Sequence, residues 1–208
     1  MKRNIILMAD IVKSRKIPAR RTADNLKLLA NTTNKKFKSE ILSPLTITLG
    51  DEFQAVIKDV ISGIRIIIFI EEFCIEKDVG FKLRYVLVNG EIETPINRKI
   101  AYGMLGEGLT RARETINNQK KSGERFFFLT DKNASELNSL FILYQSFIDD
   151  WKPRDFKIVS DFINLDDYKL VAEKNQKSVS LMWKRRKSLK IKEYKTIKNL
   201  ITQYYGLV

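Results

Sequence analysis

The sequence predicts an α+β fold in which helices stack on one β-sheet, followed by a small helical segment. Two observations lead to this prediction. Runs with the two-residue alternation of β-strands are interleaved with longer runs of helical periodicity, and a β-hairpin stands at residues 45–57. A strand followed by helices and an antiparallel hairpin is typical of an α+β sandwich. With 208 residues and 44% apolar content, the chain can bury a core of moderate size.

The elements follow one another in the order β, α, β-hairpin, α, β, α, β, α. The first strand, at residues 4–12, is almost wholly apolar, which is typical of a central strand covered on both faces. Apart from the hairpin, further strands are expected at residues 80–88 and 125–130. Helices with an apolar face are expected at residues 19–38, 59–77, 109–120 and 134–149.

The strand at residues 80–88 shows two different faces in the sequence. Apolar residues alternate there with the cations Lys82 and Arg84, so a polar face is expected beside an apolar one. Asn89-Gly90 is a dipeptide typical of tight turns, and it predicts the end of this strand.

The chain changes character after residue 150. We expect an α+β domain at residues 1–150 and a basic C-terminal segment at residues 151–208. That segment contains 14 Lys or Arg and 6 Asp or Glu, in a chain of net charge +13. Two short helices are predicted in it, at residues 165–176 and 177–187, with Val179, Met182 and Trp183 packed inward.

Two such helices joined by a tight turn are a helix-turn-helix pattern, and a basic segment of this kind favours a polyanion such as DNA. The residues expected to contact nucleic acid are Lys177, Ser178, Ser180, Lys184, Arg185, Arg186 and Lys187. The alternative is a plain basic helical hairpin that packs on the domain, or a dimer arm that would make the protein a homodimer.

Missing residue types exclude several enzyme classes. The chain has no histidine and a single cysteine, Cys74, so it lacks the parts of His/Cys zinc sites, serine–histidine triads and cysteine–histidine dyads. Catalysis would have to use carboxylates, Lys, Arg, hydroxyls or an oxygen-ligated metal. No apolar run is long enough for a membrane span and no signal-peptide pattern is present, so a cytoplasmic protein without membrane contact is expected.

Three acids are candidate ligands of a divalent cation, Mg²⁺ or Mn²⁺. Asp51 and Glu52 stand at the hairpin tip, where carboxylates can hold a cation without being fully buried. Asp10 lies near the carboxyl end of the first strand, where ligand crevices form in α/β sheets. Two alternatives remain. The hairpin acids are turn residues only, or the first strand ends before Asp10 and leaves it on the surface.

The loop after Asp10 carries groups that bind phosphates. Lys13, Ser14 and Arg15 precede Pro18, which marks the beginning of the next helix. Backbone N–H groups and these side chains are suited to cradle phosphates, although the loop lacks the glycines of a P-loop.

Two segments resemble the SatD family. Residues 8–15, MADIVKSR, resemble the family's opening GDIVxSR, and residues 46–54, TITLGDEFQ, resemble its TxGDEFQ segment. This resemblance implies a DNA-binding C-terminal tail.

The core also resembles, more distantly, class III nucleotidyl cyclases and GGDEF diguanylate cyclases. The similarity lies in DI at residues 10–11 and GDEF at residues 50–53. It implies a ferredoxin-like sandwich that binds a nucleoside triphosphate, with metal ions held by Asp10 and Asp51. It also places Gly50 beside the nucleotide and Arg113 near the position of a cyclase's transition-state arginine.

Three functions follow from these features. The first is a nucleotide- and metal-binding regulatory protein, a transcriptional regulator of the SatD type, whose basic segment binds DNA. The second is an active nucleotidyl cyclase or nucleotidyl transferase, with Asp10 and Asp51 as metal ligands and Arg113 as the charge stabiliser. The third is a non-catalytic interaction protein in which the acids are turn residues.

Overall fold

A five-stranded sheet forms the centre of the computed structural model, which describes residues 3–13, 19–130 and 133–206. Its strands are β1 (Arg3–Ile11), β2 (Ile41–Ile47), β3 (Glu52–Ile57), β4 (Leu83–Glu91) and β5 (Phe126–Leu129). They lie in the order β2-β3-β1-β4-β5. The central β1 runs antiparallel to both β3 and β4, whereas β5 runs parallel to β4.

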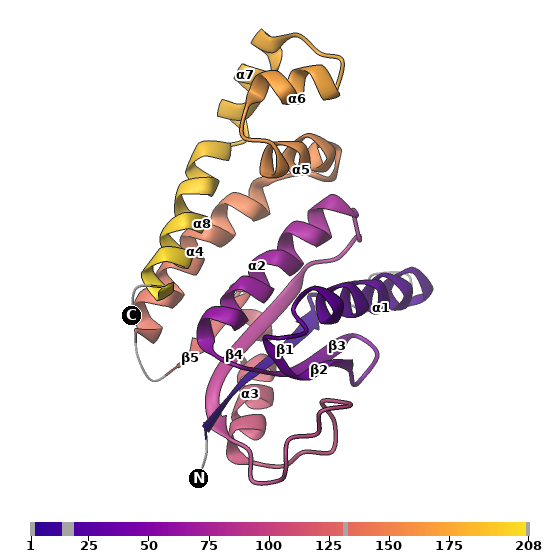
Figure 1. Cartoon of the computed structure of the whole chain (residues 1–208), viewed down its shortest axis with the longest axis vertical. Helices are drawn as coiled ribbons and strands as arrows, with labels where there is room; N and C mark the ends of the chain where they lie inside the picture. The colour runs from indigo at the N-terminus through magenta and orange to yellow at the C-terminus, as the bar shows by residue number, and fades with distance from the viewer. Residues whose placement is uncertain (1–2, 14–18, 131–132, 207–208) are drawn as a thin grey trace.

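Helices cover both faces of this sheet. They are α1 (Ala19–Lys36), α2 (Val60–Glu76), α3 (Glu107–Asn118) and α4 (Ala134–Asp150). Apolar residues of α1, α2 and α4 share one core with the sheet, and α3 forms a second core on the opposite face (Figure 1). The series β1-α1-β2-β3-α2-β4, with β1 between β3 and β4, is a ferredoxin-like unit. The predicted α+β, ferredoxin-like fold is confirmed.

The alternation of side chains along β1 determines which residues lie on each face of the sheet. Ile5, Leu7 and Ala9 belong to the core shared with α1 and α2, whereas Ile6 and Met8 belong to the core beneath α3. Successive side chains of a strand point to opposite faces. Asp10 follows Met8 by two residues, so its side chain points to the same face as Ile6 and Met8, which is the α3 side of the sheet.

Close packing of α3 against β4 depends on two glycines. A Cβ on Gly90 would lie only 2.5 Å from the Cα of Gly108, so neither position has room for a side chain. The predicted turn at Asn89-Gly90 is wrong, because both residues pair with β1 and β4 continues to Glu91. Glycine is needed at position 90 for helix packing and not for a turn.

The C-terminal helices pack on the domain. They are α5 (Phe156–Asn164), α6 (Tyr168–Lys174), α7 (Val179–Ser188) and α8 (Ile191–Gly206). α8 lies along α4, and α5 contacts α2 (Figure 1). The rings of Trp151 and Tyr194 are buried with their centres 4.9 Å apart, and the Trp151 Nε1–H donates to the Leu189 carbonyl at 2.9 Å. The core thus continues into residues 151–208, and the division at residue 150 stays a prediction.

Two of these helices, α5 and α8, were not predicted from the sequence. α6 falls within the first predicted range, and α7 falls within the second except that it ends one residue later, at Ser188. Met182 is buried as expected, but Val179 and Trp183 are 46% and 43% exposed, so their predicted packing is wrong. The reason is that α7 packs mainly against α6 and α8 and reaches Asp155 through Arg185, which leaves the side that carries Val179 and Trp183 exposed. None of the helices in the described ranges has the length and apolar character needed to cross a membrane.

Candidate functional site

A cleft of about 700 Å³ opens at the carboxyl end of β1. The end of β1, the hairpin tip, the start of β4, the turn after α3 and the end of α4 all contribute to its walls. Among the described residues, its cationic side chains are Lys13, Lys82, Arg84, Lys120, Lys121 and Arg125, and its acids are Asp10, Asp51, Glu124 and Asp149. The cleft therefore brings together three residues predicted to bind a ligand: Asp10, Lys13 and Asp51.

Asp10 and Arg84 form a buried ion pair in this cleft. Asp10 of β1 stands directly opposite both Glu52 of β3 and Arg84 of β4, so the three side chains share one row on the α3 face. The Nη1 of Arg84 donates to both carboxylate oxygens of Asp10, at 3.0 and 3.1 Å. Asp10 is 7% exposed and Arg84 is 5% exposed. The alternative that left Asp10 on the surface is wrong.

Arg84 is a residue of this site that the sequence analysis missed. Strand alternation placed it on the polar face of β4 and gave no sign of its burial, which arises because α3 and the turn after it cover this end of β4. The signal that could have identified Arg84 is Asp10, since a buried acid needs a cation from a neighbouring element. Only the strand order reveals that β4 is that neighbour.

The hydrogen-bond donors of Arg84 are incompletely used. Its Nη2 reaches the Lys120 carbonyl at 3.5 Å, which is a long contact. Its Nε is buried and has no acceptor among the described residues. A buried donor without an acceptor is costly. An oxygen of a bound anion, or of a water, would relieve that cost.

The pKa of Asp10 reflects this environment. Burial is the largest influence and raises the pKa above the ordinary value of 3.8. The cations Arg84 and Lys120 lower the pKa, while the nearby acids Asp51 and Glu52 raise it further.

Glu52 is held by a different arginine. Its Oε1 accepts from Nη1 of Arg113 at 2.9 Å and from the hydroxyl of Thr48 at 2.6 Å. Arg113 belongs to α3 and lines a separate hollow of about 420 Å³, not the cleft that contains Asp10 and Asp51. The structure thus brings Arg113 to Glu52, and its predicted catalytic role stays a prediction.

The acids predicted to bind Mg²⁺ or Mn²⁺ do not form an open metal site. A hard cation needs several free oxygen ligands. Both carboxylate oxygens of Asp10 accept from Arg84, and Glu52 accepts from Arg113. Within the ranges that the structure describes, no three metal-ligating acidic, His or Cys side chains gather in one place. A resident ion does not fit this arrangement, in which Arg84 supplies the positive charge beside Asp10.

The predicted phosphate-binding residues lie partly outside the described ranges, since Ser14 and Arg15 fall there. Lys13 lines the cleft with a φ of 56°, a left-handed conformation that is uncommon for a residue other than glycine. Gly50 has a φ of 84° in the hairpin turn, and the next carbonyl, that of Asp51, accepts from the Ile11 N–H at 2.9 Å. Gly50 thus allows the tight hairpin turn, and that turn places Asp51 at the cleft.

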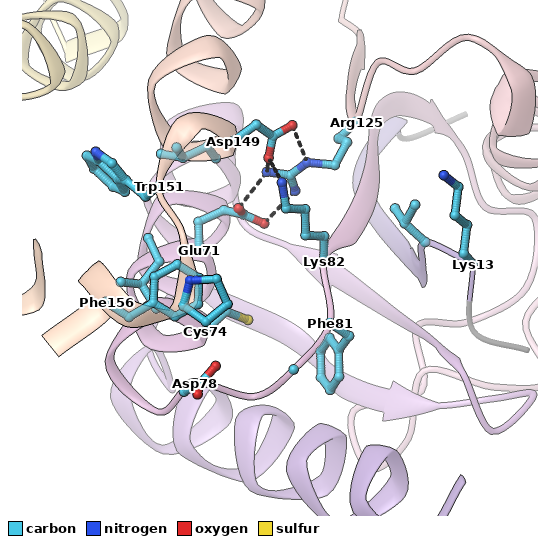
Figure 2. Close-up of a pocket in the computed structure, with 15 residues that line it drawn as sticks. Lys13, Glu71, Cys74, Asp78, Phe81, Lys82, Arg125, Asp149, Trp151 and Phe156 are labelled. Carbon is cyan, nitrogen blue, oxygen red and sulfur yellow. Dashed lines mark hydrogen bonds and ion pairs between the residues drawn. The ribbon is translucent and has the colours of Figure 1, made fainter. Parts of the chain in front are cut away.

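A second buried arginine, Arg125, stands in the wall of the same cleft. It forms a fork with Glu71: Nη1 donates to Oε1 at 2.9 Å, and Nη2 donates to Oε2 at 2.8 Å. Nη2 also reaches Asp149 at 3.1 Å, and the same Asp149 accepts from the Lys82 ammonium at 2.7 Å (Figure 2). Burial is the largest single influence and lowers the pKa of Arg125, but the charge and hydrogen bonds of Glu71 together with the charge of Asp149 raise the pKa above its ordinary value. The sequence carries no motif that singles out this cluster.

The residues predicted to contact nucleic acid lie on α7 and on the turn before it. Ser178 caps α7, because its side chain accepts from the Leu181 N–H. The exposed members of the set are Lys177, Ser178, Ser180, Lys184 and Lys187.

The other two members of that set have partners within the protein. Arg185 forms an ion pair with Asp155, and the guanidinium of Arg186 lies 6.0 Å from the centre of the Tyr168 ring. Lys187, although exposed, also lies over the Trp183 ring, 4.0 Å from its centre. DNA binding by α7 stays a prediction, and so does a homodimer.

Comparisons with known proteins give the family of the chain. Two solved structures of a bacterial light-regulated adenylyl cyclase are similar to it, each with 14% sequence identity and with TM-scores of 0.46 and 0.45. Each alignment covers 61% of this chain and 42% of the cyclase chain, so the match spans less than half of those proteins. A search of curated proteins finds no match. The model of the SatD family matches residues 4–204, almost the whole length, and the chain belongs to the SatD family.

Proposed function

We propose that this protein is a regulatory nucleotide-binding protein whose cleft holds the phosphates of a nucleoside triphosphate without a resident metal ion. The observation that carries the proposal is the Asp10–Arg84 pair, buried in a cleft of about 700 Å³ with one donor of Arg84 unused. The guanidinium occupies the place next to Asp10 that a divalent ion would otherwise take. Arginine is well suited to phosphate oxygens because its donors form a rigid planar fork.

Lysines around the pair supply further charge for an anionic ligand. Lys120 and Lys121 are exposed in the turn after α3, and Lys13 is exposed at the end of β1. Among the described residues, no ion pair involves any of the three, whereas Lys82 and Arg125 are already bound to Asp149. Their charges are thus available to phosphates, which would lie between the lysines and Arg84.

The same contacts favour binding over turnover. A two-carboxylate phosphoryl-transfer site needs acids that are free to hold metal ions. Here Asp10 is bound by Arg84 and Glu52 by Arg113. The proposal is therefore a protein that binds a nucleotide and keeps it intact, in preference to an active cyclase or nucleotidyl transferase.

Calorimetry tests this function directly. We expect ATP, GTP and inorganic tripolyphosphate to bind the full chain in the presence of EDTA, with no pyrophosphate released. Replacing Lys120 and Lys121 together by alanine should weaken binding of all three about tenfold or more, since each charged contact contributes about 1.5–3 kcal/mol. The matched control is Lys35→Ala with Lys38→Ala, which removes two exposed charges away from the cleft. Absence of binding by the unaltered protein would overturn the proposal.

DNA binding by α6 and α7 is a second candidate function. The observation that favours it is the pair of short helices joined by a turn, with Lys177 and Lys184 exposed. Replacing both lysines by alanine should weaken DNA binding and lower the slope of log affinity against log salt by up to about 1.8, as expected for two phosphate contacts. The same Lys35/Lys38 variant is the control, and an unchanged slope would remove these lysines from the interface.

A further inference from the structure

A second cavity, of about 390 Å³, adjoins the 700 Å³ cleft that is proposed to hold phosphates, here called the phosphate cleft. The two cavities share Val12, Lys13, Lys82, Arg125 and Asp149 in their linings, so they meet along one boundary. Figure 2 draws the residues of this second cavity, with Lys13 on one side, Trp151 and Phe156 on the other, and Lys82 between them. A ligand that lies across the boundary would contact both cavities at once.

The walls of the second cavity are mainly apolar and come from distant parts of the chain. Cys74 and Ile75 belong to α2, Phe81 precedes β4, and Trp151 and Phe156 follow α4. Four of these five side chains are buried within the protein, with Phe156 half-buried at the side. Flat rings bind well between aromatic and aliphatic walls of this kind.

The polar groups of this cavity are unevenly placed. On the side of the cleft, Arg125 donates to both Glu71 and Asp149, so it offers few free donors to a second anion. Figure 2 shows the Asp78 carboxylate on the opposite side of the apolar side chains, away from Arg125. Among the described residues, no ion pair or side-chain hydrogen bond involves the carboxylate of Asp78, although its carbonyl accepts from Arg21. Asp78 therefore supplies an acceptor for N–H groups at the far end of a ring.

We propose that the 390 Å³ cavity is the base-binding subsite of the same site: it takes the nucleobase of a nucleotide whose phosphates lie in the adjoining cleft. This inference rests on the proposed function and extends it from phosphates to the whole nucleotide. A flat ring with N–H donors matches apolar walls that end at a carboxylate, and a chain of phosphates matches the lysines beyond the boundary. The flat base of a nucleotide thus matches the apolar cavity, and its charged phosphates match the cationic cleft beside it.

A base in this cavity would contact the C-terminal segment. Trp151 lines the cavity, and its Nε1–H donates to the carbonyl of Leu189, which lies between α7 and α8. Phe156, also in the wall, is the first residue of α5. The bound base therefore acts on the same side chain that anchors the junction of the basic helices, which gives a direct structural link between ligand and C-terminal segment.

Tryptophan fluorescence tests the subsite, because the chain has only two tryptophans, Trp151 and Trp183. Trp183 is 43% exposed on α7, so Trp183→Phe leaves Trp151 as the sole reporter inside the cavity. We expect ATP or GTP to change the emission of this variant, whereas tripolyphosphate binds without the change. In the matched variant Trp151→Phe, the emission of Trp183 should stay nearly constant with the same ligands.

A second variant, at Asp78, replaces the charged carboxylate at the far end by a neutral amide that keeps a single acceptor oxygen. Asp78 has a φ of 43°, which asparagine adopts readily, so Asp78→Asn preserves the turn. It should weaken binding of ATP or GTP about fivefold while tripolyphosphate binding stays unchanged, as expected for the loss of one good hydrogen bond. Equal affinities for nucleotide and tripolyphosphate, with unchanged Trp151 emission, would overturn the base subsite and leave the phosphate cleft standing. Failure of every probe to bind would overturn both.

Discussion

Two buried arginines stand at the same cleft, and they differ in how completely their donors are used. All three nitrogens of Arg125 have acceptors, provided by Glu71, Asp149 and the Leu83 carbonyl. Arg84 has one good partner, Asp10, a long contact to a carbonyl, and an Nε without an acceptor among the described residues. Both side chains are about equally buried, at 4% and 5% exposure.

This difference separates a structural ion pair from a ligand-binding one. A fully bonded buried pair gains nothing from a ligand, because any new contact must replace an existing one. A pair with an unused donor in an open cleft is more stable when an anion or water completes it. Under the proposed function, Arg125 belongs to the architecture and Arg84 to the ligand, and five variants probe this difference.

The largest effect is expected from Arg125→Met. Removing the guanidinium leaves the buried Glu71 without its cation, whereas Asp149 keeps Lys82, and breaking a buried pair such as Arg125–Glu71 costs about 3–5 kcal/mol. Urea denaturation measures the loss of unfolding free energy. The exposed Arg111→Met, on the outer side of α3, is the control and should change stability by less than about 0.5 kcal/mol. A loss below 1 kcal/mol for Arg125→Met would contradict its structural role.

A smaller loss of stability is expected from Arg84→Met, about 1–3 kcal/mol. Burial already raises the pKa of Asp10, so this acid can take up a proton when its cation is removed, which limits the loss of stability. Tripolyphosphate binding should be lost in the folded variant, as measured by calorimetry. If binding persisted, the anion would have to be held by the lysines alone.

The two clusters should also respond to pH in opposite ways. Burial raises the pKa of Asp149, but Arg125 and Lys82 outweigh it and the net pKa lies below 3.8. The stabilisation from its charge is present above pH 3.8 and is lost as the pH falls through the lowered pKa. Asp10 has a raised pKa, so the cost of its charge appears only as the pH rises from 3.8 through the raised pKa.

Urea midpoints of the parent, Asp149→Asn and Asp10→Asn between pH 3 and 7 therefore distinguish the clusters. The stability advantage of the parent over Asp149→Asn should shrink as the pH falls below 3.8. Its advantage over Asp10→Asn should instead grow as the pH falls from the raised pKa of Asp10 toward 3.8. Parallel curves for both variants would show that the two acids have the same environment.

The smallest effect is expected from Arg113→Ala. This arginine is 41% exposed at its side chain, and its pair with Glu52 lies outside the cleft. Exposed pairs contribute about 0–1 kcal/mol, so stability should fall by no more than that. Nucleotide affinity, measured by calorimetry, should stay within about twofold of the parent. A large loss of affinity would instead support the role that the cyclase resemblance gives to Arg113.

Some of the site was predictable from local sequence. Asp10 stands at the end of an apolar strand, and Asp51 stands at a glycine turn, so both signals lie within a few residues and the cleft contains both. Arg84 and Arg125 could not be found this way. Their partners lie on other elements, 74 residues away for Asp10 and 54 residues away for Glu71. A sequence shows a cation in a strand but not the acid that the fold places beside it.

The C-terminal segment shows the same limit of local patterns. Its helices α6 and α7 were predicted from periodicity, but the inward packing of Trp183 was not observed. Trp151, at the end of α4, carries no local signal and yet joins the core, the second cavity and the junction after α7. Which tryptophan is buried depends on the position of α8 along α4, and that contact is tertiary.

The sequence by itself determined the order of strands and helices up to residue 150, the α+β class, the exclusion of histidine and zinc chemistry, and the two acids at the end of β1 and at the hairpin. These depend on periodicity and residue type, which act over a few neighbouring residues. Tertiary structure alone decided that Arg84 neutralises Asp10, that Arg113 binds Glu52, and that an apolar cavity adjoins the cationic cleft. The physical reason is that charges and apolar walls act through space, and the sheet order 2-3-1-4-5 brings together side chains that the chain keeps far apart.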